Sequence, residues 1–98
     1  MNKINSNSFI MKISIKRVTK EELTKMGVFN WPIWTCEVSE FPWIYSEKES
    51  CYILDGEIEV KTNEEIVNIR PRDFVIFPKG LSCTWTVSKP VRKHYFFG

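Results

Sequence analysis

The side chains best suited to chemistry lie in two short stretches of the chain. Glu49 and Cys51 stand two residues apart in the first, and Cys83 and Trp85 stand two residues apart in the second. Both stretches are rich in strand-forming residues, and side chains two apart on a strand point to the same face. If Glu49 points to the interior, Cys51 does so too. The spacing therefore predicts an interior that holds one carboxylate and two thiols.

Trp43 and Tyr45 show the same spacing and add an indole and a phenol to this interior. Aromatic walls around a few polar groups are typical of a small-molecule site. A carboxylate enclosed by such walls would have a raised pKa suited to proton exchange with Tyr45, whereas one near the opening would stay solvated; both alternatives are open. We predict a ligand site lined by Trp43, Tyr45, Glu49, Cys51, Cys83 and Trp85.

A metal site is a second possible use of these side chains. A transition metal takes at least three protein ligands, preferably from histidine, cysteine and carboxylate side chains. Glu49 and Cys83 supply two and Cys51 a possible third, which is short of a full set. We therefore expect no bound metal and no other cofactor.

A nucleophilic Cys83 would need a cation beside it, and His94 is the only histidine. In the last strand His94 shares a face with Arg92. The other face is more apolar and should point to the core; it carries Val91, Lys93, Tyr95 and Phe97. A regular strand would turn His94 outward, and a β-bulge would reverse this.

Short strands are the elements that must position these residues. Roughly eight or nine are expected, separated by turn signals. They include residues 51–54 and 57–62, joined by a hairpin at Asp55-Gly56, and residues 82–87 and 91–97. One short helix is expected near residues 20–26, where Thr19 begins a capping box. The pattern predicts an all-β sandwich or barrel with one short N-terminal helix.

Composition limits the remaining classes. The chain of 98 residues suits one domain, which we place at residues 11–98 behind a flexible polar tail at residues 1–10. The net charge of +2 is scattered, so nucleic acid is not an expected partner. No apolar run is long enough for a membrane span and no signal-peptide core occurs, so we expect a cytoplasmic protein. The three cysteines are odd in number and contain no Cys-x-x-Cys pair, so we expect no disulfide framework.

Two segments carry a family resemblance. Glu49 and Gly56 match the first cupin motif, which ends in a glutamate, six residues and a glycine. Residues 72–83 resemble the second motif, in which Pro78 and Gly80 match the pattern Pro-x-Gly. The chain thus resembles small single-domain cupins and is similar to the cupin domain of the (S)-ureidoglycine aminohydrolase family. This resemblance implies a jelly-roll-like antiparallel β-barrel.

The departures from the cupin pattern bear on function. Cupins usually hold a metal through two histidines before the glutamate and a third in the second motif. Here Trp43 and Tyr45 stand where the first pair would fall, and Cys83 stands where the third would. Arg72 replaces the glycine of the second motif, and Glu49 alone remains of the four usual ligands.

Three functions follow as hypotheses. The first is the binding of a small molecule inside the barrel without the usual metal. The second is a small hydrolase, lyase or isomerase related to ureidoglycine aminohydrolases, acting through Glu49, Tyr45, Cys83 or a retained metal. The third is a structural or oligomeric module with a plugged barrel, forming a homodimer through aromatic residues such as Trp31 and Trp34. An open cavity around Glu49 would favour the first two.

Overall fold

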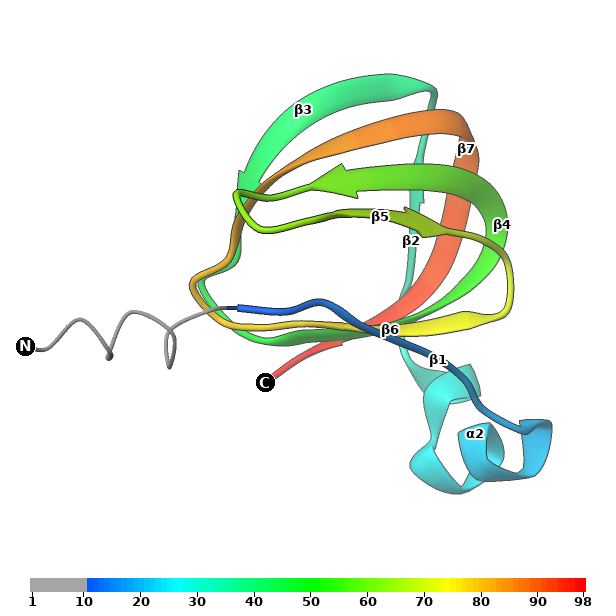
Figure 1. The fold of residues 1–98 in the computed structure, drawn as a ribbon. Coiled ribbons are helices and arrows are strands. Elements are labelled where there is room, and N and C mark those ends of the chain that lie inside the picture. The colour runs from blue at the N-terminus through cyan, green and yellow to red at the C-terminus, as the bar shows by residue number, and fades with distance from the viewer. Residues whose placement is uncertain (1–10) are drawn as a thin grey trace, which may run out of the picture.

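The structure is a computed structural model and describes residues 11–98; the predicted tail at residues 1–10 lies outside the described residues. Seven strands form one antiparallel sheet that curls into a barrel, in the order β1-β6-β4-β7-β2, with β3 beside β7 and β5 beside β4 (Figure 1). The elements are β1 (Ser14–Arg17), α2 (Lys20–Met26), the 3₁₀ turn η1 (Val28–Asn30), β2 (Ile33–Cys36), β3 (Ser39–Ile44), β4 (Glu49–Lys61), β5 (Ile66–Ile69), β6 (Asp73–Phe77) and β7 (Ser82–Phe97). The predicted all-β fold with one short helix is confirmed.

Helix α2 begins and ends where the sequence predicts. The Thr19 hydroxyl accepts a hydrogen bond from the backbone N–H of Glu22, which satisfies one of the free donors of the first turn. Gly27 ends the helix in the left-handed conformation at φ 78°. Leu23 and Val28 then pack with Phe74 on the outside of the barrel. No helix among the described residues is long and apolar enough to cross a membrane.

The predicted strand count was too high because two long strands bend without ending. The segments 51–54 and 57–61 both belong to β4, which ends one residue before the predicted end at 62. The segments 82–87 and 91–97 both belong to β7. The pairing of β4 with β7 shifts register between Ile53 and Ile58, as bulges do. The predicted hairpin at Asp55-Gly56 is therefore wrong, and Gly56 lies at a bend inside a strand.

Strand β3 contains a proline. It runs from Ser39 to Ile44, with Pro42 inside it. Proline lacks a backbone N–H, so it is tolerated only where that group has no partner strand. Among the strands of residues 11–98, β3 pairs with β7 alone, so its other edge accommodates the proline.

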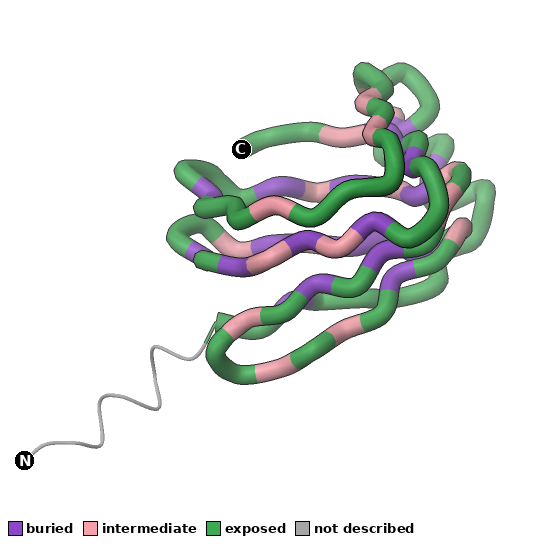
Figure 2. The backbone as a smooth tube through the Cα atoms, turned by 90° about the horizontal axis from the view of Figure 1, so that it is seen from above, coloured by how far each residue is buried: buried purple, intermediate pink, exposed green. Residues whose placement is uncertain are grey.

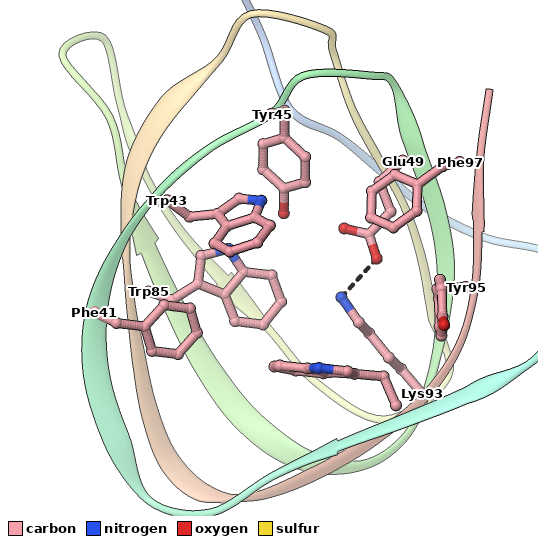
Figure 3. Close-up of a pocket in the computed structure, with 9 residues that line it drawn as sticks. Phe41, Trp43, Tyr45, Glu49, Trp85, Lys93, Tyr95 and Phe97 are labelled. Atoms are coloured by element: carbon pink, nitrogen blue, oxygen red, sulfur yellow. Dashed lines mark hydrogen bonds and ion pairs between the residues drawn. The ribbon is translucent and has the colours of Figure 1, made fainter.

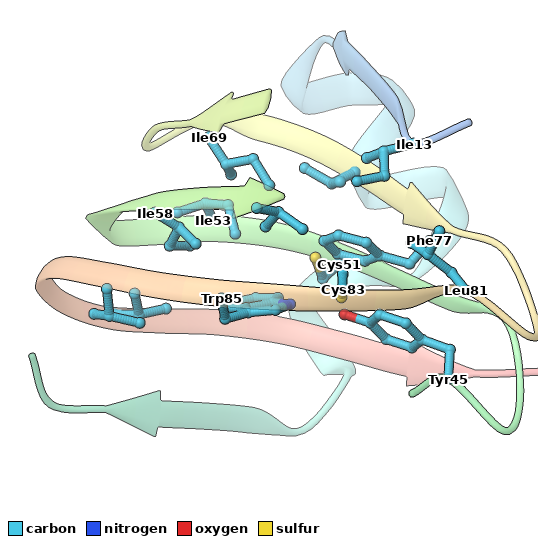
Figure 4. Close-up of a cluster of buried hydrophobic side chains, with 14 residues drawn as sticks. Ile13, Tyr45, Cys51, Ile53, Ile58, Ile69, Phe77, Leu81, Cys83 and Trp85 are labelled. Carbon is cyan, nitrogen blue, oxygen red and sulfur yellow. The ribbon is translucent and has the colours of Figure 1, made fainter. Parts of the chain in front are cut away.

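Buried and less buried positions alternate along much of β4 and β7 (Figure 2), and most of the buried apolar residues of the strands belong to the main core inside the barrel. The main core fills one part of this interior with apolar side chains from β4, β5, β6 and β7 (Figure 4). Cys51, Val75 and Phe77 are fully buried there. This packing leaves the other part of the interior to the larger aromatic residues.

Arg72, which replaces the glycine of the second motif, is the only described non-glycine residue with a positive φ, at 76°. The left-handed conformation destabilises a residue with a Cβ by about 1–2 kcal/mol. Glycine avoids this strain, but it loses more backbone entropy on folding, which offsets part of the gain. We expect Arg72→Gly to raise the free energy of unfolding by about 0.5–1 kcal/mol in urea denaturation. Arg70→Gly, two residues away, is the control and should lower the free energy of unfolding. Equal effects of the two changes would contradict a left-handed backbone at Arg72.

Candidate functional site

The barrel interior is hollow where β2, β3 and β7 face the start of β4. A cavity of about 200 Å³ opens there, and seven of its nine lining residues are aromatic (Figure 3). The lining residues are Trp34, Phe41, Trp43, Tyr45, Glu49, Trp85, Lys93, Tyr95 and Phe97. The remaining two, Glu49 and Lys93, are charged.

Glu49 and Lys93 form an ion pair inside the barrel. The Lys93 ammonium donates a hydrogen bond to Glu49 Oε2 at 2.7 Å, and the two side chains are 3% and 6% exposed. The same ammonium lies 4.7 Å from the ring centre of Trp34 and 4.6 Å from that of Trp85, within cation–π range. Both charges are therefore compensated, as a buried pair requires.

Tyr45 and Trp85 supply polar groups beside this pair. The Tyr45 ring stacks on Phe77 with centroids 4.9 Å apart and an angle of 10°, which fixes the direction of its hydroxyl. Burial, and then the Glu49 carboxylate, raise the pKa of Tyr45 well above its usual value, so the hydroxyl stays protonated. The nearby Trp85 N–H lowers the pKa of Tyr45 and so offsets a small part of this increase. The same N–H has no hydrogen-bond partner within the geometric limits of such a bond, and it is the buried side-chain donor left unpaired among the described residues.

Cys51 and Cys83 lie in the hydrophobic core beside the cavity and do not line it. This corrects the prediction that both thiols face the ligand site. Burial raises the pKa of Cys51 to about 12 and that of Cys83 to about 11, and Glu49 adds to both shifts. Lys93 opposes the shift at Cys51, and the Trp85 N–H opposes it at Cys83. Both thiols are protonated at neutral pH and are poor nucleophiles.

These pKa values predict a selective thiol reaction. At pH 8 the half-buried Cys36 should react with a disulfide reagent such as DTNB at an ordinary rate. Cys83 should react on the order of a hundredfold more slowly, and Cys51 on the order of a thousandfold more slowly, because their thiolate fractions are smaller by about these factors. The same reaction in denaturant is the control, and there all three thiols should react at an ordinary rate. Fast reaction of all three in the folded protein would contradict the burial described here.

His94 points away from the cavity, as the alternation of the last strand predicts. Its Nδ1 lies 2.9 Å from the carbonyl oxygen of Trp31, and the Phe29 ring meets the imidazole edge-on at 5.9 Å. The turn η1 therefore covers His94 on the outside of the barrel. It is buried there and does not pair with Cys83.

The donor set does not fit a transition metal. Within residues 11–98, no three His, Cys, Asp or Glu side chains lie close enough together to hold one. Glu49, the one ligand position retained from the cupin pattern, is bonded to Lys93. Cys51 and Cys83 lie in the core beside Glu49 and do not join it on the cavity wall.

Comparison with known proteins agrees with the barrel and its two motifs. Residues 23–95 match the model of the EutQ-like cupin domain. The chain belongs to the EutQ-like cupin family. It is 48% identical to a DUF861-family protein from Thermotoga maritima, with a TM-score of 0.86, over 89% of this chain and 100% of that one. No match was found among the curated proteins.

A more distant structure supports the fold alone. The EutQ protein of Clostridium difficile is 16% identical to this cupin, with a TM-score of 0.61, over 89% of this chain and 68% of that one. The two chains therefore share the barrel, and at this identity nothing is transferred about ligand or reaction.

Four of the six predicted site residues line the cavity of this cupin: Trp43, Tyr45, Glu49 and Trp85. Their role in binding remains a prediction. The main residue that the sequence did not single out is Lys93, although the alternation of the last strand had placed it on the inward face. A lysine among apolar inward positions was the available signal. Phe41 continues the two-residue spacing of Trp43 and Tyr45 and also lines the cavity. The sequence did not indicate this, because a proline at position 42 argues against a strand that continues through it.

Proposed function

We propose that this EutQ-like cupin binds a small molecule inside its barrel without a metal ion. The observation that carries the proposal is the cavity itself, with aromatic walls around a buried and charge-compensated pair. Such enclosed apolar sites with a few oriented polar groups are the usual form of small-molecule pockets. In the family pattern Glu49 would face a metal, and in this chain the Lys93 ammonium takes the place of that cation.

Catalysis is the weaker alternative because the candidate catalysts are poorly placed for it. Tyr45 and Cys83 keep their protons at neutral pH, since burial raises both pKa values. His94 lies outside the barrel, bonded to Trp31. Glu49 is the remaining candidate base, and it is held by Lys93. A relationship to ureidoglycine aminohydrolases stays a hypothesis that the match to the EutQ-like family leaves open.

The plugged-barrel alternative is also less favoured. An open cavity adjoins Tyr45 and Trp85, the residues that would have to fill it. Trp31 and Trp34, considered for a dimer interface, are half-buried within the chain. Trp31 packs on Phe96 with ring centres 5.5 Å apart, and Trp34 meets Trp85 edge-on at 5.9 Å.

A screen of small compounds by saturation-transfer NMR tests the proposal, with Trp34→Leu and Trp31→Leu as matched variants. Both tryptophans are half-buried, but Trp34 alone lines the cavity. Compounds that bind the native chain should bind Trp34→Leu at least about tenfold more weakly and Trp31→Leu almost unchanged. A screen without binders, or binders that respond to Trp31 instead, would contradict interior binding.

A further inference from the structure

We propose that the cavity selects an uncharged, planar molecule with an amide-type edge, in which a carbonyl oxygen and an N–H lie side by side. This rests on the proposed function and adds the chemical class of the ligand. Three features of the site carry it: its charge balance, the direction of its polar groups and the nature of its walls.

The charges of the site already cancel. Glu49 and Lys93 are the charged residues of the cavity lining, and they are bonded to each other at 2.7 Å. Tyr45, Cys51 and Cys83 stay neutral beside them, so they supply no spare charge to a ligand. A charged ligand would enter an apolar enclosure without a free counter-charge, which is costly. The balance therefore favours an uncharged ligand.

The polar groups that remain form a donor and an acceptor on the same side. The Trp85 N–H is buried, has no hydrogen-bond partner, and is turned toward the Tyr45 hydroxyl (Figures 3 and 4). A ligand oxygen beside the protonated Tyr45 hydroxyl would accept from it, and a small shift of the Trp85 and Tyr45 side chains would open the buried Trp85 N–H to the same oxygen. Lys93 donates to Glu49 Oε2, and the other carboxylate oxygen faces Tyr45 and the cavity (Figure 3). That oxygen can accept from a ligand N–H.

The rest of the lining suits a flat apolar body. Phe41 stacks on Trp85 with centroids 6.0 Å apart and an angle of 18°, and Trp43 meets Tyr45 edge-on at 6.3 Å. Flat walls of this kind favour planar ligands by stacking and edge contacts. A planar ring that carries an amide would use the walls, the unpaired donor and the free carboxylate oxygen together.

Four probes of nearly equal size test this inference by isothermal titration calorimetry on the full chain: benzamide, benzoate, benzylammonium and toluene. We expect benzamide to bind at least about tenfold more tightly than each of the other three, about the value of one good hydrogen bond. The preference of benzamide over toluene should disappear in Trp85→Phe and shrink in Tyr45→Phe, a nearly isosteric change that keeps the ring stack on Phe77. Tyr52→Phe, on the outer side of the barrel, is the control and should leave all four affinities unchanged.

The possible failures separate the two proposals. Tightest binding of benzoate or benzylammonium would overturn the uncharged class while interior binding stands. Equal binding of toluene and benzamide would overturn the amide-type edge. Binding of none of the four probes would contradict both the ligand class and the proposed function.

Discussion

Replacement of Lys93 by methionine should lower the free energy of unfolding by about 3–5 kcal/mol, because it leaves the buried Glu49 carboxylate without a counter-charge. The side chains are similar in length, so packing between Trp34 and Trp85 changes little. Urea denaturation at neutral pH measures the effect. The double variant Glu49→Gln, Lys93→Met removes both charges and should lie within about 2 kcal/mol of the native chain.

The neighbouring residue provides the control for this result. Arg92 bonds to Asp55 at the same distance of 2.7 Å, but the two side chains are 50% and 58% exposed. Arg92→Met should therefore cost less than about 1 kcal/mol. If Lys93→Met cost no more than Arg92→Met, the buried pair would not be the organising contact of the cavity.

The second large effect is expected at the bend of β4. A Cβ added at Gly56 would lie 2.6 Å from the Pro90 carbonyl oxygen and 2.8 Å from Val91 Cα, and φ is 109°. Both obstacles are backbone atoms of β7, so the strands would have to separate. We expect Gly56→Ala to lower the free energy of unfolding by about 2–5 kcal/mol in urea denaturation, from conformational strain and overpacking together.

Gly27→Ala separates these two causes. Gly27 has a φ of 78° but no atom within 4 Å of an added Cβ, so only conformational strain applies there. It should cost about 1 kcal/mol. Equal costs at Gly27 and Gly56 would show that the close approach of β4 and β7 is not part of the native structure.

The sequence predicts the fold well because the relevant signals are local. Alternation along each strand, the Thr19 cap and the Gly27 stop all lie within a few residues of the elements that they define. The bends of β4 and β7 were not predictable in this way. Gly56 and Pro90 each resemble a turn signal in isolation. Only the pairing of β4 with β7, in which Glu57 lies opposite Lys89, makes them bends within continuous strands.

The site was predictable in part for a related reason. Spacing brought Trp43, Tyr45, Glu49 and Trp85 to one interior, and the structure places them around one cavity. The partner of Glu49 is 44 residues away on another strand, and a local pattern does not contain that pairing. The same spacing correctly placed Cys51 and Cys83 on the inward face of their strands. It did not show that they lie in the core beside the cavity, because that depends on how the neighbouring strands pack over them.

The indole N–H region of a ¹⁵N–¹H NMR spectrum tests the central claim of interior binding most directly, because the chain has four tryptophans and each gives one signal. Three of them line the cavity, and Trp31 lies outside it. On titration with benzamide, we expect the Trp85 signal to shift most, as its free donor gains an acceptor, while the Trp31 signal stays in place. A shift confined to Trp31, or no shift at Trp85 at saturating benzamide, would contradict a ligand site inside the barrel.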